Sequence, residues 1–366
     1  MKRIAAILAL CLLLTGCNAW MDGSYVYVSI HPHQNQDTQG GTESVSATNY
    51  QELVKALTDM VEAGTEQGII YVSNYIQTQV QRHTDIAIRE ITMTNPIGAY
   101  AVEQIIYEKG TNAGQAALAV TITYRHDRDE ILRIKQVQGA EGIQAAIAAA
   151  LGQYDSSLVL RVSDYQEQDL EQMVRNYADS RPDVVMEVPQ TVVAVFPEQG
   201  NDRVVELKFT YQTSRDDMRT MQSRVEQMFK SAEIYAGGDW TEEEKFIRLY
   251  AWLMEPNEYT LETSITPSYS LLQHSVGDSK AFAVVYAALC RQAGMECLVV
   301  SGTREGESWY WNMVCDNGVY YHVDLLRCLD QGYYSERTDP AMDGYVWDYT
   351  AYPAGGSRKT AENPEE

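Results

Sequence analysis

Positive charge is scarce in this sequence. Lysine and arginine number 28 against 51 aspartates and glutamates, which gives a formal net charge of −23. Such a balance opposes association with polyanions, so we expect no nucleic-acid partner and no electrostatic binding to anionic lipids or wall polymers. Phenylalanine is also rare, with 5 residues against 25 tyrosines. Tyrosine-rich surfaces suit wet, amphipathic contacts, but this composition identifies no ligand.

Several chemical motifs are missing as well. Residues 50–232 contain no Gly-rich phosphate loop, no His–Glu metal motif and no Gly-x-Ser-x-Gly elbow. The cysteines follow no zinc-binding spacing. The sequence therefore predicts neither a cofactor nor a metal site.

Six cysteines are present, and their positions separate two roles. Cys11 lies in the apolar N-terminal stretch, and Cys17 follows it. The other four fall in the C-terminal third, where an exported protein allows disulfides and four cysteines allow three pairings. These four are Cys290, Cys297, Cys315 and Cys328.

The N-terminus has the pattern of an export signal. Lys2-Arg3 is followed by an apolar run over residues 4–14, which is too short to span a membrane as a mature helix. Leu14-Thr15-Gly16-Cys17 matches the bacterial lipobox. We predict a lipoprotein signal peptide over residues 1–17, with Cys17 lipidated and the protein anchored to the extracytoplasmic face of the cell membrane. The alternative is an ordinary signal with a chance cysteine.

Two segments are predicted to lack a packed fold. Residues 18–49 are rich in Gln, Ser, Thr, Gly and Asn, which is typical of a flexible tether. A short alternation over residues 25–28 indicates one possible strand within it. The polar residues 354–366 are expected to form a disordered tail.

Residues 50–232 resemble a tandem duplication with an offset of about ninety residues. We predict two α/β repeat units, residues 50–138 and 139–232, each with a helix, a strand, an irregular crossing, two strands and a closing helix. The recurring Arg128-Asp129 and Arg215-Asp216 pairs are interpreted as turns or helix starts. The expected strands lie at residues 70–75, 100–107, 118–124, 160–165, 191–196 and 204–211, and the first helices carry apolar faces at Leu53, Leu57, Val61 and Ile143, Ile147, Leu151.

A C-terminal domain is expected over residues 233–353. Thr241 with Glu244 forms a capping box before an apolar helix. Gly277-Asp278 offers a turn and an N-cap for a second helix, which ends at Gly294. That helix has an apolar face of Phe282, Val285, Tyr286, Leu289 and Cys290, and strands are predicted at residues 297–301, 309–314 and 319–325, with an aromatic return strand near 344–348.

This order of elements resembles the bacterial transglutaminase-like domain, a branch of the papain-like cysteine hydrolases. The resemblance implies an α+β fold in which the two α/β repeat units precede the transglutaminase-like (papain-like) domain. The family places a nucleophilic Cys at the start of a buried helix, a His in an H-x-W-N strand and an Asp on the next strand. Carried over, these positions fall on Ser279, Trp309 and Asp324, and Trp311 with Asn312 completes the H-x-W-N pattern.

Only the aspartate of the three family positions is retained, so we expect the domain to be catalytically inactive. A serine hydroxyl gains little from a helix dipole and needs a positioned base. The indole of Trp309 donates a hydrogen bond and cannot accept a proton. The leading hypothesis is therefore a lipid-anchored protein whose degenerate domain binds or scaffolds, with a protein or peptide at the former cleft.

Two alternatives remain open on the sequence alone. In the first, the domain is an active hydrolase or acyl transferase of the cysteine-protease-like kind, with Ser279 as nucleophile and a relocated His322 or His274 as base. This requires an imidazole about 3 Å from Ser279 Oγ. In the second, the protein is structural and the repeat units carry the partner contact.

Overall fold

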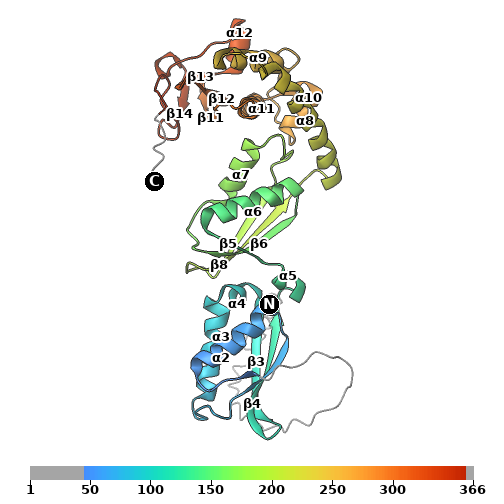
Figure 1. Ribbon diagram of the computed structural model, residues 1–366, viewed down its shortest axis with the longest axis vertical. Helices are drawn as coiled ribbons and strands as arrows, with labels where there is room; N and C mark the ends of the chain where they lie inside the picture. Colours follow the sequence, from blue (N-terminus) through green and yellow to red (C-terminus); the bar gives the residue numbers. More distant parts are fainter. Residues whose placement is uncertain (1–44, 360–366) are drawn as a thin grey trace, which may run out of the picture. The chain divides into compact units, whose positions relative to one another are not determined.

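The computed structural model describes residues 45–359 (Figure 1). The predicted signal peptide with Cys17, the possible strand at 25–28, the tether up to residue 44 and the tail from residue 360 lie outside the described residues. Among the described residues, contacts divide the chain into two units, of which one holds residues 45–91 and Val102–Arg128, and the other holds Thr92–Ala101 and residues 129–359. No helix within the described part is long and apolar enough to cross a membrane.

The first unit is a four-stranded sheet with helices packed on it (Figure 1). The sheet order is β1-β2-β4-β3, in which β1 runs parallel to β2 and the other neighbours are antiparallel. The predicted face of Leu53, Leu57 and Val61 is confirmed, because all three are fully buried. The elements are β1 (Val45–Ser46), α2 (Tyr50–Glu62), β2 (Gln67–Tyr71), α3 (Val80–Thr94), β3 (Val102–Asn112) and β4 (Gln115–Tyr124).

One predicted strand begins later than expected. The sequence indicated a strand from residue 100, but residues 96–101 form the helix α4 (Pro96–Ala101), and β3 starts at Val102. Pro96 sits at the first helical position, where its missing N–H costs no hydrogen bond, so the chain can start a helix there.

The second unit opens with a sheet of the order β5-β6-β8-β7, again with its first strand parallel to its second. The Arg-Asp pairs are confirmed as helix starts, since Arg128 and Arg215 are the first residues of α5 and α8. The duplication and the boundaries proposed for it stay predictions. The elements are α5 (Arg128–Leu132), β5 (Lys135–Gln138), α6 (Gly139–Gln153), β6 (Ser157–Ser163), α7 (Leu170–Ser180), β7 (Gln190–Phe196), β8 (Arg203–Thr210) and α8 (Arg215–Ala236).

The C-terminal part of this unit surrounds an antiparallel sheet of the order β13-β12-β11-β14. The capping box of Thr241 and Glu244 forms at the start of α9 as predicted. The elements are α9 (Glu242–Met254), β9 (Glu258–Tyr259), α10 (Pro267–His274), β10 (Val276–Gly277), α11 (Ser279–Gln292), β11 (Cys297–Arg304), β12 (Glu307–Asp316), β13 (Val319–Val323), α12 (Leu325–Gln331), the 3-10 turn η1 (Asp339–Ala341) and β14 (Tyr345–Trp347).

Helix α11 is the centre of this region. The sequence predicted one apolar face, but all ten residues from 281 to 290 are buried, because β11 and β12 pack on one side and helices α8, α9 and α10 pack around the rest. The Tyr286 hydroxyl donates to the Phe246 carbonyl at 3.0 Å, and the Asn312 amide donates to the Ala283 carbonyl at 2.9 Å. These bonds fix the helix against α9 and β12, so its first residue, Ser279, is held in place.

The opposite face of the sheet carries a second cluster built around Trp311, which is 1% exposed. Gly302 makes this packing possible. A Cβ at Gly302 would lie 2.2 Å from the Val346 carbonyl oxygen and 2.8 Å from the Trp311 ring, so only a hydrogen fits between β14 and that ring.

The four cysteines of the domain are free thiols in this structure, and all four are buried. None of the three conceivable pairings is formed. Burial raises the pKa of the Cys290 thiol well above its ordinary value, and Cys297 beside it adds to the shift. A buried protonated thiol reacts slowly, so these residues behave as small apolar side chains of the core.

Glu336 is a half-buried carboxyl in an acidic neighbourhood. Burial and the charges of Asp316 and Glu243 raise the pKa of Glu336 from 4.5 to about 7, and the hydrogen bond from the Tyr334 hydroxyl opposes part of this shift. The folded state therefore holds this proton more tightly than the unfolded chain does. The contribution of Glu336 to the free energy of unfolding is therefore lost as pH rises from about 4.5 through about 7.

We predict that Glu336→Gln stabilises the protein at pH 8 by about 1–2 kcal/mol and has little effect near pH 4.5, because the amide stays neutral and still accepts from Tyr334. Urea unfolding at both pH values measures this difference, and Glu305→Gln, an exposed glutamate on the β11–β12 turn, is the control. A stabilisation that is the same at both pH values would contradict the pKa of Glu336.

Candidate functional site

Ser279 is the first residue of α11 and is 7% exposed. The residue before it caps the helix: Asp278 Oδ1 accepts the Ala281 N–H at 2.8 Å, and its Oδ2 accepts the Thr263 hydroxyl at 2.9 Å. Ser279 Oγ accepts the backbone N–H of Tyr310 at 3.3 Å. The cap and this bond hold the serine hydroxyl between the helix start and strand β12.

Trp309 and Asp324 meet directly. Trp309 lies on β12, one residue before the strand N–H that reaches Ser279, and its indole Nε1–H donates to Asp324 Oδ2 at 2.9 Å. The ring of Tyr259 lies beside it, with centroids 5.5 Å apart. Tyr259 is opposite Gly277 in the short β9–β10 ladder, which places this ring near the start of α11.

Asp324 does not lie on a strand, as the sequence predicted, but at the start of a helix. The sequence indicated a strand through residue 325, but β13 ends at Val323 and Asp324 is the N-cap of α12. Its Oδ1 accepts the backbone N–H groups of Leu326 at 3.0 Å and Arg327 at 3.2 Å. An aspartate before a helix satisfies N–H groups that have no partner within the helix, so the local sequence favours this turn.

The second oxygen of Asp324 is equally occupied. Besides the Trp309 indole, Oδ2 accepts the Tyr345 hydroxyl at 2.6 Å and lies 3.4 Å from an Arg304 guanidinium nitrogen. Asp324 is 3% exposed, and these donors compensate for the burial of its charge. Burial, followed by the charge of Asp324, raises the pKa of Tyr345, so this hydroxyl stays protonated and keeps donating.

Arg304 connects the aromatic side chains to the carboxylate. Its guanidinium carbon lies 5.1 Å from the centroid of the Trp309 ring and 5.8 Å from that of Tyr345. At these distances the guanidinium makes cation–π contacts with both rings, and these contacts hold the arginine side chain in place. Ser279, Trp309 and Asp324 therefore belong to one neighbourhood, but the bonds that link them run through the Tyr310 backbone and the indole N–H.

His322, the first candidate for a relocated base, is bound elsewhere. It is fully buried on the face of the sheet that holds Trp311, where Nδ1 accepts the Trp311 indole N–H at 3.0 Å and Nε2 lies 2.9 Å from Asp339 Oδ1. Because an indole only donates, the proton of His322 is on Nε2 and is donated to Asp339. Burial lowers the pKa of His322, although Asp339 partly opposes this.

His274, the second candidate, ends α10, and its ring packs edge-on against Tyr269 with centroids 5.3 Å apart. Among the residues that the structure describes, the Tyr310 N–H is the only hydrogen-bond partner of Ser279 Oγ. Neither imidazole is hydrogen-bonded to Ser279 Oγ. Within residues 45–359 no three His, Cys, Asp or Glu side chains gather into a metal-binding group.

Four contributors to the site were not singled out in the sequence: Arg304, Tyr345, Tyr259 and the N–H of Tyr310. Tyr345 was expected only as part of the return strand, and nothing in its spacing indicates a bond to Asp324. Arg304 reaches Asp324 because β11 extends to residue 304, three residues beyond its predicted end. The available signal was a charged residue that follows the apolar run of residues 297–300.

The solved structures that resemble this chain have low sequence identity to it. No curated protein matches the chain. The solved structures that resemble it include a transglutaminase ("TGase"; 10% identity, 46% of this chain and 50% of that one, TM-score 0.27), a proposed cysteine protease from Cytophaga hutchinsonii (14%, 43% and 70%, 0.26) and a proposed protease from Parabacteroides distasonis (8%, 70% and 39%, 0.23). The chain thus spans about half of the first of these. TM-scores this low do not establish a shared overall architecture.

The family match is confined to the C-terminal domain. Residues 230–325, which run from the end of α8 to the first residue of α12, match the Transglutaminase-like superfamily. The resemblance seen in the sequence is confirmed over this region, and the chain carries a transglutaminase-like domain.

Proposed function

We propose that this transglutaminase-like domain binds a partner without turning it over. One observation carries the proposal: the indole of Trp309 donates to Asp324 at the position where the family's pattern has a histidine. A histidine there would accept a proton from the nucleophile while the aspartate orients it. The indole can only donate, so the Asp324 carboxylate is engaged without a base between it and Ser279.

The hydrogen bonding of the Ser279 hydroxyl supports the same proposal. Its oxygen accepts from Tyr310, and no basic nitrogen among the described residues receives its hydrogen. A serine hydroxyl becomes a useful nucleophile only when an adjacent base removes its proton. The hydrogen of the Ser279 hydroxyl has no acceptor among the described residues, so it can be donated to a carbonyl oxygen of a peptide-like ligand.

The surroundings of Ser279 support a binding role through exposed apolar side chains. The segment from β9 to β10 carries Leu261 at 86% exposure and Ile265 at 50%, and Tyr259 and Val276 are also exposed. The bond from Thr263 to Asp278 ties this segment to the start of α11. Apolar and aromatic groups with adjacent polar atoms are the usual composition of a peptide-binding surface.

We further propose that Cys17 is diacylated and anchors the protein to the extracytoplasmic face of the membrane, with protein or peptide partners at the domain and no nucleic acid among them. The lipobox and the apolar run before it support this anchor, and the net charge of −23 supports the exclusion of nucleic acid.

We expect that the Ser279 hydroxyl does not act as a nucleophile in any reaction. Wild-type protein and Ser279→Ala should give equal, background rates in peptide-hydrolysis and amine-incorporation assays, because no base activates the serine. The exposed Ser308→Ala on β12 is the matched control. Turnover that is lost in Ser279→Ala and kept in Ser308→Ala would overturn the proposal.

Asp324 is expected to act as a structural residue. Asp324→Asn places an amide NH₂ among side-chain and backbone donors, so we predict a loss of about 2–4 kcal/mol in the free energy of unfolding. Denaturant unfolding measures this, with Asp330→Asn, a 73% exposed aspartate 4.0 Å from Arg304, as the control. Unchanged stability in Asp324→Asn would contradict the role assigned to its five hydrogen bonds.

The anchor predicts a simple change in fractionation. Cys17→Ser should release the protein from the membrane fraction and remove the mass of the acyl groups from the N-terminal peptide. Cys11→Ser lies within the predicted signal and should leave both properties unchanged. A Cys17→Ser protein that stays in the membrane fraction would exclude lipid on Cys17 as the anchor.

A further inference from the structure

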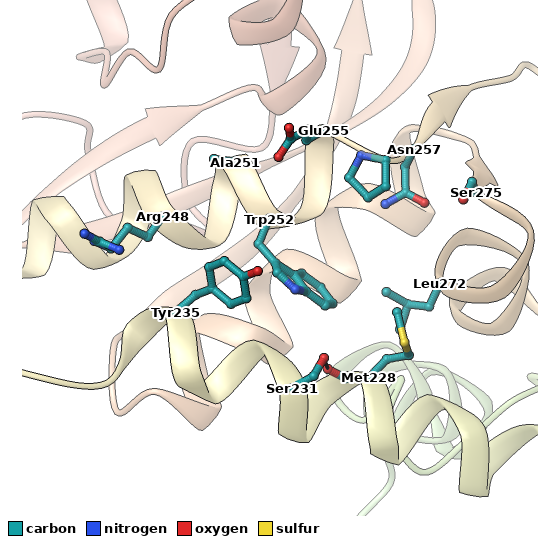
Figure 2. A pocket seen from close by; sticks show the side chains of 11 residues that line it. Met228, Ser231, Tyr235, Arg248, Ala251, Trp252, Glu255, Asn257, Leu272 and Ser275 are labelled. Carbon is teal, nitrogen blue, oxygen red and sulfur yellow. Dashed lines mark hydrogen bonds between the residues drawn. The ribbon is translucent and has the colours of Figure 1, made fainter.

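A cavity of about 530 Å³ is lined by side chains of helices α8, α9 and α10 and of the residues that follow α9 and α10 (Figure 2). Its volume is in the range of small-ligand sites. Neither Ser279, Trp309 nor Asp324 lines it. Its wall combines two aromatic rings with three neutral polar side chains, which are Tyr235, Trp252, Ser231, Asn257 and Ser275.

The two aromatic rings provide apolar surface that a ligand can reach. The rings of Tyr235 on α8 and Trp252 on α9 have centroids 6.4 Å apart and planes inclined by 55°. Tyr235 is 46% exposed and Trp252 is partly buried. Tyrosine and tryptophan combine a large apolar face with a polar group, so they suit ligands that are apolar on one side and polar on the other.

The neutral polar groups of the cavity keep unused hydrogen-bonding capacity. Asn257 is 8% exposed, and its amide donates to the Leu253 carbonyl at 2.6 Å, which leaves Oδ1 without a hydrogen-bond partner among the described residues. Figure 2 shows this oxygen directed toward Ser275. The Ser275 hydroxyl also has no partner in the part of the chain that the structure describes. It can therefore both donate and accept.

The backbone of Ser275 supports a role for this hydroxyl. Ser275 is the C-cap of α10 and has a φ of 61°, which lies in the left-handed region. Glycine is the usual residue at such a helix end, because a side chain is strained there. A serine at this position accepts the strain and places a hydroxyl at the cavity, and strained residues occur frequently at binding sites.

The charged side chains at the cavity favour neither a cation nor an anion. Arg248 and Glu255 both line it, and their charges are opposite. The Arg248 guanidinium carbon lies 3.6 Å from the centroid of the Trp240 ring. In Figure 2 the Glu255 carboxylate projects from the side of α9 that is away from Trp252. The net charge of −23 further opposes an anion, so the cavity suits an uncharged ligand.

A purely apolar ligand is disfavoured as well. It would cover Asn257 Oδ1 and the Ser275 hydroxyl without giving either a hydrogen bond, and the desolvation of these groups would then cost free energy. The ligand that remains is neutral and has both an apolar face and several hydroxyl groups.

We propose that this cavity binds a neutral saccharide. A sugar ring presents a face of C–H groups, which lies against Tyr235 and Trp252. Hydroxyl groups at the edge of the ring donate to Asn257 Oδ1 and accept from the Ser275 hydroxyl. This site is separate from the Ser279 region and does not depend on the function proposed for that region.

The test is an NMR titration of the full mature chain, followed at the Trp252 indole N–H, which is assigned with Trp252→Phe. The probes are the methyl glycosides of glucose, galactose, mannose and N-acetylglucosamine, and the disaccharides cellobiose and N,N′-diacetylchitobiose. Cyclohexanol, a ring with a single hydroxyl, and sorbitol, an open chain of hydroxyls, are the controls. We expect a saturable shift with at least one saccharide and at least about fivefold weaker binding of both controls.

The two sizes of probe distinguish the possible sources of the saccharide. Equal affinity for a methyl glycoside and its disaccharide would assign the cavity to a single sugar ring, and tighter binding of the disaccharide would extend the site to a glycan chain. No shift at Trp252 with any of the saccharides, or binding of cyclohexanol that is as tight, would overturn the proposal.

Variants separate the hydroxyl of Ser275 from the stability of the fold. Ser275→Gly should weaken saccharide binding about threefold or more, yet keep or raise the midpoint of urea unfolding, because glycine adopts this φ without strain. Tyr235→Leu should weaken binding by a similar factor. The exposed Ser308→Gly and Tyr349→Leu are the matched controls and should leave binding unchanged. Unchanged affinity in either Ser275→Gly or Tyr235→Leu would contradict the proposed site.

Discussion

The carboxylate of Asp324 is the point on which the rest of the C-terminal domain depends. It accepts two backbone N–H groups of α12, the indole of Trp309 on β12 and the hydroxyl of Tyr345 on β14, and it pairs with Arg304 on β11. A buried charge is tolerated only when it is surrounded by such donors. One side chain thus joins three strands and a helix and determines where the chain turns after β13.

The same arrangement decides the chemistry that the site supports. A tryptophan is compatible with Asp324 because its N–H is one more donor, and no change in protonation is needed to keep the bond. The histidine of the same sheet, His322, lies on the other face between Trp311 and Asp339. His322 therefore has a structural role, since both of its ring nitrogens are hydrogen-bonded to neighbouring side chains. The domain has aspartate, histidine and serine in one fold, but their bonds do not connect them into a relay.

The sequence predicted the helices and strands of this domain well, but it did not predict the side-chain hydrogen bonds that join them. The capping box at Thr241, the N-cap at Asp278 and the apolar face of α11 depend on neighbouring residues, so local patterns reveal them. The predicted end of the strand before Asp324 was wrong by two residues, because the apolar pattern of β13 continues to the first residue of α12. The bonds of Asp324 to Arg304 and Tyr345 join residues that are twenty or more positions apart, and no local pattern encodes such pairs.

Covalent labelling of Ser279 tests the central claim, that this serine is not activated, most directly. A fluorophosphonate reacts with a serine whose proton is withdrawn by a base, and the intact mass of the protein reports the adduct. The account predicts no adduct on Ser279 over a pH range from 6 to 9. The Trp309 indole is bonded to Asp324 at the position of the family's histidine, and an indole cannot accept a proton from Ser279. An adduct that maps to Ser279 and disappears in Ser279→Ala would contradict it and would identify an active hydrolase.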